Sequence, residues 1–293
     1  MLSAVSKIDS RPAPERDGDI KGQGSFFLDA HVHLHWQYDV GDFLEGACLR
    51  FREARGRLGE LHLSLGVLAL VDPNGQDSFE RVREWLAQAT GRWTVRETLE
   101  AASLILFDEA TDVELVLLAG RQIATVEGLE VLAVGSREEQ REERSLRDTL
   151  DSVQAAGAIT ILSWGFGKWW FRRGRMVEDV LRSADPEALF LGDNSGRLRY
   201  GQPPKAFRIA AVRGIRILPG SDPLPRPDDA RRAGSYGAII EGDLDRSRPA
   251  AGLKKLLSEN PNQPRVCGSL RPLWPFLSDQ LLMQLRKRVS GRR

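Results

Sequence analysis

Short apolar runs alternate with amphipathic stretches along most of this 293-residue chain. Most of the runs are continuously apolar, which is typical of parallel strands buried on both faces. The stretches between them carry apolar residues at helical spacing, as Phe79, Val82 and Leu86 do. The pattern predicts a parallel α/β fold, with strands at 25–33, 63–71, 114–118, 129–134, 158–164, 188–191, 215–218 and 237–241 and helices at 42–54, 78–89, 146–156, 176–183, 204–213 and 251–258.

The segment 93–135 departs from this pattern, because several strand-like runs follow one another with turn signals between them. It predicts a local antiparallel excursion within the sheet. The body of the chain has no internal repeat and no linker, so residues 25–293 are expected to form one domain that ends in a basic helix at 272–289. Residues 1–24 are polar and are expected to form a flexible tail.

Charge and cysteine usage restrict the class of protein. The chain has 42 Lys and Arg against 41 Asp and Glu residues, which excludes a strongly basic nucleic-acid binder, and we do not expect a nucleic-acid partner. Cys48 and Cys267 form no C-x-x-C pair, as is typical of a reducing compartment. The N-terminus lacks the apolar core of a signal peptide, and no apolar run is long enough for a transmembrane helix. We therefore expect a cytoplasmic protein with no membrane partner.

Three of the four histidines lie in LDAHVHLH, at the end of the first predicted strand. His31 and His33 are two residues apart, so on a strand both imidazoles project to the same side and can reach one metal ion. His35 continues the register if the strand does. The alternative is a polar strand end that holds no ion.

The order of the motifs resembles the PHP (polymerase and histidinol phosphatase) superfamily, whose first strand ends in D-x-H-x-H, as residues 29–33 do. Five later pieces are similar, in the same order, to the family's T-D-H, G-x-E, H-P, E-x-x-N and G-S-D-x-H segments; they are residues 66–82, 119–136, 156–166, 190–197 and 214–225. The resemblance covers residues 25–245. It implies a distorted (β/α) TIM-like barrel with metal-dependent phosphoester hydrolysis at its C-terminal face.

Several positions depart from the family pattern. Non-ligands or weak ligands stand where the family has metal ligands: Pro73, Gln122, Ser163 or Trp164, and Leu224. A neutral amide at the position of the bridging glutamate cannot join two divalent ions as a carboxylate does. The resemblance therefore implies a reduced centre with one ion per chain at most.

His31, His33 and Asp222 remain as ligands for one Zn²⁺, Mn²⁺ or Fe²⁺ ion, with Asp193 as a candidate fourth ligand. A metal there lowers the pKa of a bound water and polarises a phosphoryl group. Asp72 or Asp193 would then act as the general base. Asp72 also opens D-P-N-G, which is equally a β-turn sequence, so a purely structural role stays open.

The stretch SWGFGKWWFRRGR, residues 163–175, combines aromatic and basic side chains after a predicted strand. It is interpreted as a loop at the catalytic face, in which Lys168, Arg172 and Arg173 neutralise a phosphorylated small-molecule substrate, with Arg121 nearby. The alternative is a contact between copies of the chain in a homo-oligomer, because Trp and Arg are enriched at interfaces.

Three functions follow. The first is a metal-dependent hydrolase, a phosphoesterase that acts on a small phosphorylated substrate. The alternative is a catalytically degenerate PHP-like barrel that binds a ligand or a protein, which the four altered ligand positions favour. An amidohydrolase ranks last, because it requires later histidines or a carboxylated lysine, and Lys168 is the only plausible lysine.

Overall fold

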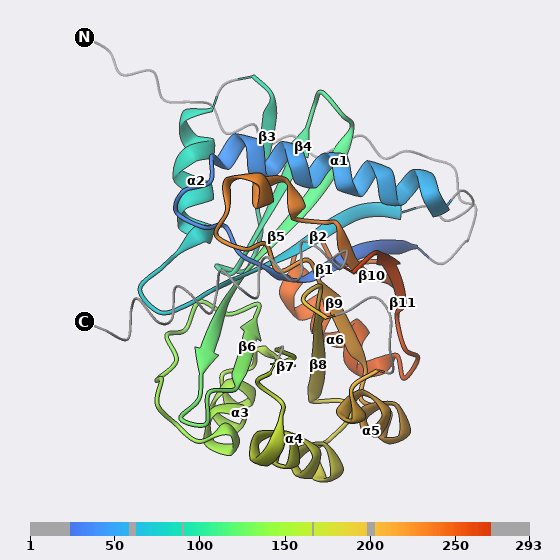
Figure 1. Cartoon of the computed structure of the whole chain (residues 1–293). Coiled ribbons are helices and arrows are strands. Elements are labelled where there is room, and N and C mark those ends of the chain that lie inside the picture. Colours follow the sequence, from blue (N-terminus) through green and yellow to red (C-terminus); the bar gives the residue numbers. More distant parts are fainter. Residues whose placement is uncertain (1–23, 59–62, 90, 166, 198–202, 271–293) are drawn as a thin grey trace.

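The computed structural model describes residues 24–270 except 59–62, 90, 166 and 198–202 (Figure 1). The predicted tail up to residue 23 and the predicted helix at 272–289 lie outside the described residues. The elements are β1 (Ser25–Val32), α1 (Val40–Leu58), β2 (Leu63–Asp72), α2 (Ser78–Gln88), β3 (Trp93–Glu97), β4 (Ser103–Asp108), β5 (Val113–Ala124), β6 (Glu130–Val134), α3 (Leu146–Ala155), β7 (Ile159–Ser163), α4 (Phe171–Ser183), β8 (Leu189–Asn194), α5 (Lys205–Arg213), β9 (Ile217–Gly220), the 3₁₀ helix η1 (Pro227–Arg232), β10 (Tyr236–Glu241), α6 (Pro249–Glu259) and β11 (Arg265–Gly268).

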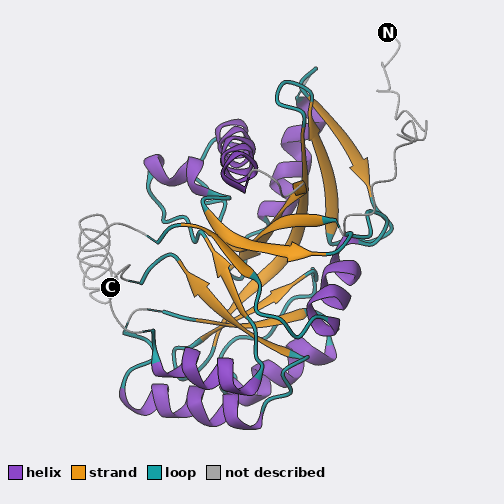
Figure 2. Ribbon diagram, turned by 90° about the vertical axis from the view of Figure 1, so that its right-hand side faces the viewer, coloured by secondary structure: helices purple, strands orange, loops and turns teal. Residues whose placement is uncertain are grey.

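All the described strands belong to one sheet, in the order β11-β10-β1-β2-β5-β6-β7-β8-β9, with β3 and β4 as a branch on β5. Strands β1, β2 and β5 run parallel to one another, as do β7, β8 and β9. Strand β9 also lies against β1 and β10, which brings the two ends of the sheet together. The result is a mixed α/β fold with a nearly closed, barrel-shaped sheet and helices on its outside (Figure 2).

The antiparallel excursion at 93–135 is confirmed by the pairing of β3 with β4, β4 with β5, and β5 with β6. The expectation that the remaining strands are parallel is wrong for β10, which is antiparallel to β1 and to β11. The connection from β9 to β10 contains only η1 and no crossover helix. A chain without a crossover helix does not return to the opposite end of the sheet, so β10 runs backwards.

Three buried clusters explain the continuous apolar runs. Helices α1 and α2 pack on one face of β2 through Leu68 and Leu70, whereas Val67 and Ala69 of the same strand face a second cluster inside the barrel. Helices α3, α4 and α5 cover the outside of β6, β7 and β8 in a third cluster. Helix α6 contributes Leu253 to the inner cluster. Because both faces of these strands are buried, alternation of apolar and polar residues is lost.

Among the residues that the structure describes, none of the helices combines the length and the apolar character needed to cross a bilayer.

Candidate metal centre

The polar residues of the candidate site lie at one end of the barrel-shaped sheet. The strands that run in the direction of β1 end there, and the antiparallel strand β6 begins there, so its first residue, Glu130, pairs with the last residue of β7, Ser163. This end of the strands brings together His31 on β1, Gln122 on β5, Ser163 on β7, Asn194 on β8 and Asp222 after β9, and Asp72 at the end of β2 shares a cavity with His33. Active sites of barrel folds lie at this end of the strands.

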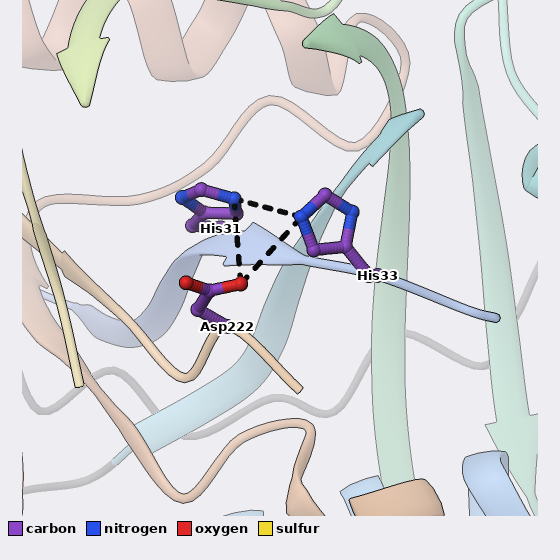
Figure 3. Close-up of side chains that lie close together, drawn as sticks. All are labelled: His31, His33 and Asp222. Carbon is purple, nitrogen blue, oxygen red and sulfur yellow. Dashed lines mark hydrogen bonds and ion pairs between the residues drawn. The ribbon is translucent and has the colours of Figure 1, made fainter. Parts of the chain in front are cut away.

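His31, His33 and Asp222 converge on one point (Figure 3). The two Nε2 atoms of His31 and His33 are 3.0 Å apart. Oδ1 of Asp222 lies 3.8 Å from Nε2 of His31 and 3.5 Å from Nε2 of His33. Asp222 is far from the two histidines in the sequence, and the contact between β1 and β9 brings them together.

The spacing of these three atoms fits a transition-metal ion. A point equidistant from them lies about 2 Å from each, which is the length of a Zn–N or a Zn–O bond. Two imidazoles and one carboxylate with open positions also suit Fe²⁺. Burial, with the adjacent His31 ring as a second cause, lowers the pKa of His33, which keeps its imidazole neutral and able to bind a cation.

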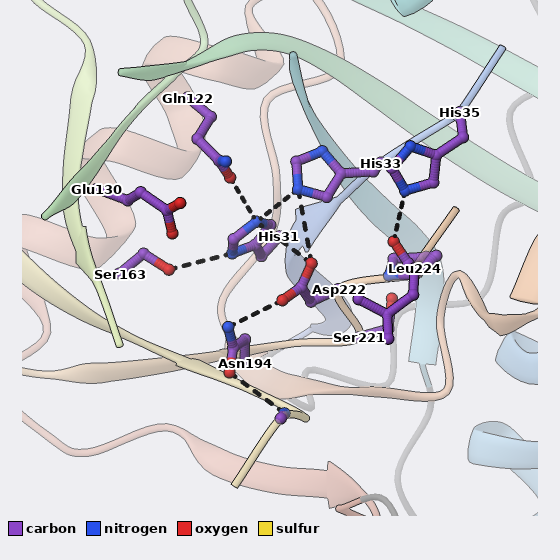
Figure 4. Close-up of polar contacts among 12 residues, drawn as sticks. His31, His33, His35, Gln122, Glu130, Ser163, Asn194, Ser221, Asp222 and Leu224 are labelled. Atoms are coloured by element: carbon purple, nitrogen blue, oxygen red, sulfur yellow. Dashed lines mark hydrogen bonds and ion pairs between the residues drawn. The ribbon is translucent and has the colours of Figure 1, made fainter. Parts of the chain in front are cut away.

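Neighbouring side chains fix the His31 ring (Figure 4). Oγ of Ser163 lies 3.3 Å from Nδ1 of His31, on the ring nitrogen opposite the triad. Oε1 of Gln122 lies 3.1 Å from Nε2 of His31, so the amide at this altered position points at the centre. Trp164, the other residue considered at the H-P position, is buried in the outer cluster with α3, α4 and α5.

Asp222 adopts a backbone conformation that is rare for a residue other than glycine, with φ of +43°. Its N–H donates to the carbonyl oxygen of His31 at 2.9 Å, which ties the turn after β9 to β1. Nδ2 of Asn194 donates to Oδ2 of Asp222 at 2.8 Å, so Oδ1 is the oxygen turned to the histidines. Strained backbone of this kind is found at functional sites, where surrounding contacts hold it in place.

Replacing Asn194 by alanine is expected to lower the affinity for a divalent ion about tenfold, because Asp222 loses the donor that orients it. Isothermal titration of metal-free protein with Zn²⁺ measures the change. Asn262→Ala, at an exposed position on the other side of the fold, is the matched control. Equal affinities for the two variants would show that Asn194 does not orient the ligand.

Asp29, the first residue of D-x-H-x-H, holds the backbone around the triad in place. It is fully buried, and its carboxylate accepts hydrogen bonds from the backbone N–H groups of Ser221 at 2.8 Å, Gly234 at 2.8 Å and His31 at 3.3 Å. Burial raises its pKa to about 7, although these hydrogen bonds act in the opposite direction. One side chain thus holds β1 and the two ends of the β9–β10 connection together.

His35 does not join the triad, because β1 ends at Val32 and the chain turns away. Nε2 of His35 lies 2.8 Å from the carbonyl oxygen of Pro223 and binds the loop next to Asp222. Tyr38 donates to the carbonyl oxygen of Leu224 in the same loop, so the backbone of Leu224 helps to hold this loop in place. Burial lowers the pKa of His35, which favours the neutral ring in this contact.

Asp72 lies beside the centre and lines a cavity of about 180 Å³ together with His33, Leu34, His35, Pro73, Gln76 and Gln122. Its carboxylate accepts hydrogen bonds from the backbone N–H of Ser78 at 2.7 Å and from Oγ of Ser78 at 2.6 Å. These bonds fix the start of α2. Asp72 is therefore placed against the candidate site, with both oxygens already bonded.

Asp193 is not part of the centre. Its carboxylate forms an ion pair with Arg197 at 2.7 Å and 2.9 Å and accepts a third hydrogen bond from the hydroxyl of Tyr236 at 2.7 Å. Its oxygens contact Arg197 and Tyr236, and Asp193 is not among the described residues whose ligand atoms converge with those of His31 and His33. The ligand role and the base role of Asp193 therefore stay predictions.

The basic residues that were predicted to bind the substrate come from separate parts of the fold, Arg121 from β5 and Arg172 and Arg173 from α4. Arg121 donates to the carbonyl oxygen of Gln76 at 2.9 Å, at the wall of the cavity. The expected loop at 163–175 is shorter than predicted, because α4 begins at Phe171 and carries Arg172 and Arg173 on its first turn. Arg173 donates to the carbonyl oxygen of Gly167 at 3.0 Å, and Arg172 is exposed. The predicted oligomer contact at this segment stays a prediction.

Glu130 is the residue that the sequence analysis missed. Its carboxylate forms an ion pair with Nζ of Lys168 and points into the space beside His31, Gln122 and Ser163 (Figure 4). Its charge acts on His33, where it opposes the lowering of the pKa. The tripeptide at 128–130 has the form G-x-E, which is the signal that points to Glu130 rather than to Gln122.

No protein-family model matches the chain, and no curated protein matches its sequence. Its fold is similar to that of PsfC from Pseudomonas syringae PB-5123, with a TM-score of 0.53 and 12% identity over 89% of this chain and 99% of that one. It is also similar to the lesion-specific endonuclease PfuEndoQ from Pyrococcus furiosus, with a TM-score of 0.51 and 13% identity over 85% of this chain and 60% of that one. At these identities the likeness concerns the fold alone.

Proposed function

We propose that the chain is a divergent PHP-type hydrolase that holds one divalent ion on His31, His33 and Asp222 and cleaves phosphoesters. The convergence of three ligand atoms on one point is the observation that carries this proposal. The nearly closed barrel and the position of the triad at the carboxyl ends of its strands support it. A bound divalent ion supplies an acidified water and a polarised phosphoryl oxygen.

We assign proton transfer to Glu130, because its carboxylate faces the space beside His31, whereas the carboxylate of Asp72 is turned to Ser78 at the start of α2. Glu130 faces the centre from the first position of β6, and its side chain is 20% exposed, which leaves access for water. Lys168 holds the Glu130 carboxylate and places a positive charge beside the site. Asp72 acts as a positioning residue that fixes α2 and the wall of the cavity beside His33.

The substrate is a phosphoester whose reacting group fits the small cavity of about 180 Å³, while the rest of the molecule lies outside it. Arg121, which contacts the backbone of the cavity residue Gln76, and Arg172 and Arg173 on α4 provide cations for further negative charge. The formal net charge of only +1 favours a small phosphorylated substrate. A fold neighbour that is an endonuclease favours a phosphodiester in a nucleic acid, so we include both classes in the test.

Metal-free protein reloaded with Mn²⁺ or Zn²⁺ is expected to hydrolyse p-nitrophenyl phosphate, a monoester, or bis-p-nitrophenyl phosphate, a diester. Glu130→Gln is expected to lower kcat about a hundredfold and to keep the ion, because the amide cannot accept the proton. The double variant His31→Ala with His33→Ala is expected to lose both the ion and the activity. Hydrolysis that persists in this double variant would refute the proposed centre.

The second candidate function is a barrel that has lost catalysis and binds a ligand or a protein. The observation that favours it is the contact of Gln122 with His31 at 3.1 Å, because a neutral amide beside the triad is a weaker ligand for a divalent ion than a carboxylate. A protein that binds no ion and hydrolyses neither ester, while it remains folded, would support this candidate instead.

A further inference from the structure

A buried arginine lies at the end of the sheet opposite the triad. Arg216 immediately precedes β9 and is 3% exposed, whereas Asp222 follows the same strand at its other end. The Arg216 guanidinium lies 4.9 Å from the centre of the Phe190 ring. It donates to the carbonyl oxygen of Leu257 at 2.5 Å and to that of Gly214 at 3.3 Å.

None of these contacts provides a negative charge to pair with the Arg216 guanidinium. Both acceptors are neutral carbonyl groups, and Nε is buried without a hydrogen-bond partner. Within the described part of the chain, no carboxylate forms an ion pair with Arg216; Glu187 and Asp185 act on it only through their more distant charges. Burial lowers its pKa. A buried cation without an anion is costly, so the surroundings of Arg216 favour a negatively charged partner.

Arg216 lines a cavity of about 200 Å³. Its apolar wall is formed by Ile239, Leu256 and Pro264. Its polar wall comprises Arg216, Glu241, Asn260, Asn262 and Gln263. The cavity therefore offers one buried cation, several amides and an apolar surface, and it shares no residue with the cavity next to the triad.

We propose that this cavity binds a small organic monocarboxylate. The planar guanidinium has five N–H donors, of which Arg216 uses two, and its fork matches the two oxygens of a carboxylate. The apolar wall suits a short hydrocarbon group. Glu241 lines the same cavity and offsets one positive charge, which disfavours a dianion such as phosphate.

A structural role for Arg216 is the competing explanation, since Leu257 lies in the last turn of α6 and a cation stabilises that end of a helix. This role requires the two hydrogen bonds and needs no ligand. It predicts that carboxylates do not bind in the cavity.

The experiment titrates the full chain with butyrate and benzoate at constant ionic strength and follows binding by calorimetry. Butanol and inorganic phosphate are the controls for hydrophobicity and for charge. We expect saturable binding of the carboxylates, with weaker or no binding of the controls. The double variant His31→Ala with His33→Ala should bind them unchanged, which separates this site from the proposed catalytic centre.

Two exposed positions test the site without removing Arg216, whose loss would endanger folding. Glu241→Gln removes the opposing charge and is expected to tighten carboxylate binding about threefold. Asn262→Asp adds a negative charge to the same wall and is expected to weaken binding by a similar factor. No saturable binding, or equal affinity in both variants, would overturn the proposal.

Discussion

Replacing Gly220 by alanine is expected to destabilise the fold by about 3 kcal/mol or more and to disrupt the metal centre. Gly220 is the last residue of β9, two residues before Asp222. A Cβ atom at this position would lie 2.4 Å from Cβ of His31 and 2.6 Å from its backbone N. Because the clash involves backbone atoms of β1, a rotamer change cannot relieve it. Strands β9 and β1 would have to separate, and that contact closes the sheet.

Gly56→Ala is the matched control. Gly56 lies within α1, and an added Cβ would meet no atom within 4 Å. Alanine is favoured over glycine in a helix, so this variant is expected to be more stable by about 0.5–1 kcal/mol. Thermal unfolding of the two variants should therefore give shifts of opposite sign. A Gly220→Ala protein that unfolds at the temperature of the parent chain would contradict the closed contact between β9 and β1.

Asp29→Asn is expected to destabilise the protein by about 3 kcal/mol. The carboxylate accepts three backbone hydrogen bonds, from residues 31, 221 and 234. An asparagine offers one oxygen, and its amide group would face an N–H donor. At least one buried donor then loses its partner, and the β9–β10 connection is released from β1. Chemical denaturation measures the change in the free energy of unfolding.

The control for this variant is Asp112→Asn, at an exposed turn with φ of +53° that asparagine adopts readily. We expect a change within about 0.5 kcal/mol there. The result that would argue against the role of Asp29 is a loss no larger than that of the control. The change from Asp to Asn would then lower the free energy of unfolding equally little at buried position 29 and at exposed position 112.

Much of the fold could be predicted from local pattern. The continuous apolar runs indicated strands such as β2 and β7, because strands buried on both faces lose alternation. The direction of β10 was missed although the sequence already showed no helix between 218 and 237, because the pattern of the other strands was extended to it. The first residue of α4 was placed too late, because aromatic and basic residues at 171–175 resemble a loop sequence.

The candidate site, too, could be predicted from the sequence only in part. The spacing of His31 and His33 predicts that they share a side, but only the resemblance to a family linked them to Asp222 across the chain. Asp193 has the right residue type at the right strand end, yet Arg197 and Tyr236 occupy its oxygens. The ion pair with Arg197 is local, four residues along the chain, whereas the hydrogen bond from Tyr236 depends on a tertiary contact that no spacing reveals.

The most direct test of the account is the metal content of the protein, measured by elemental analysis after loading with Zn²⁺ or Mn²⁺ and removal of free ions. We expect about one ion per chain in the parent protein and in His35→Gln, because the ring of His35 contacts Pro223 and not the triad. We expect near-complete loss of the ion in the double variant His31→Ala with His33→Ala. Less than about a tenth of an ion per parent chain, or an ion retained by the double variant, would contradict it.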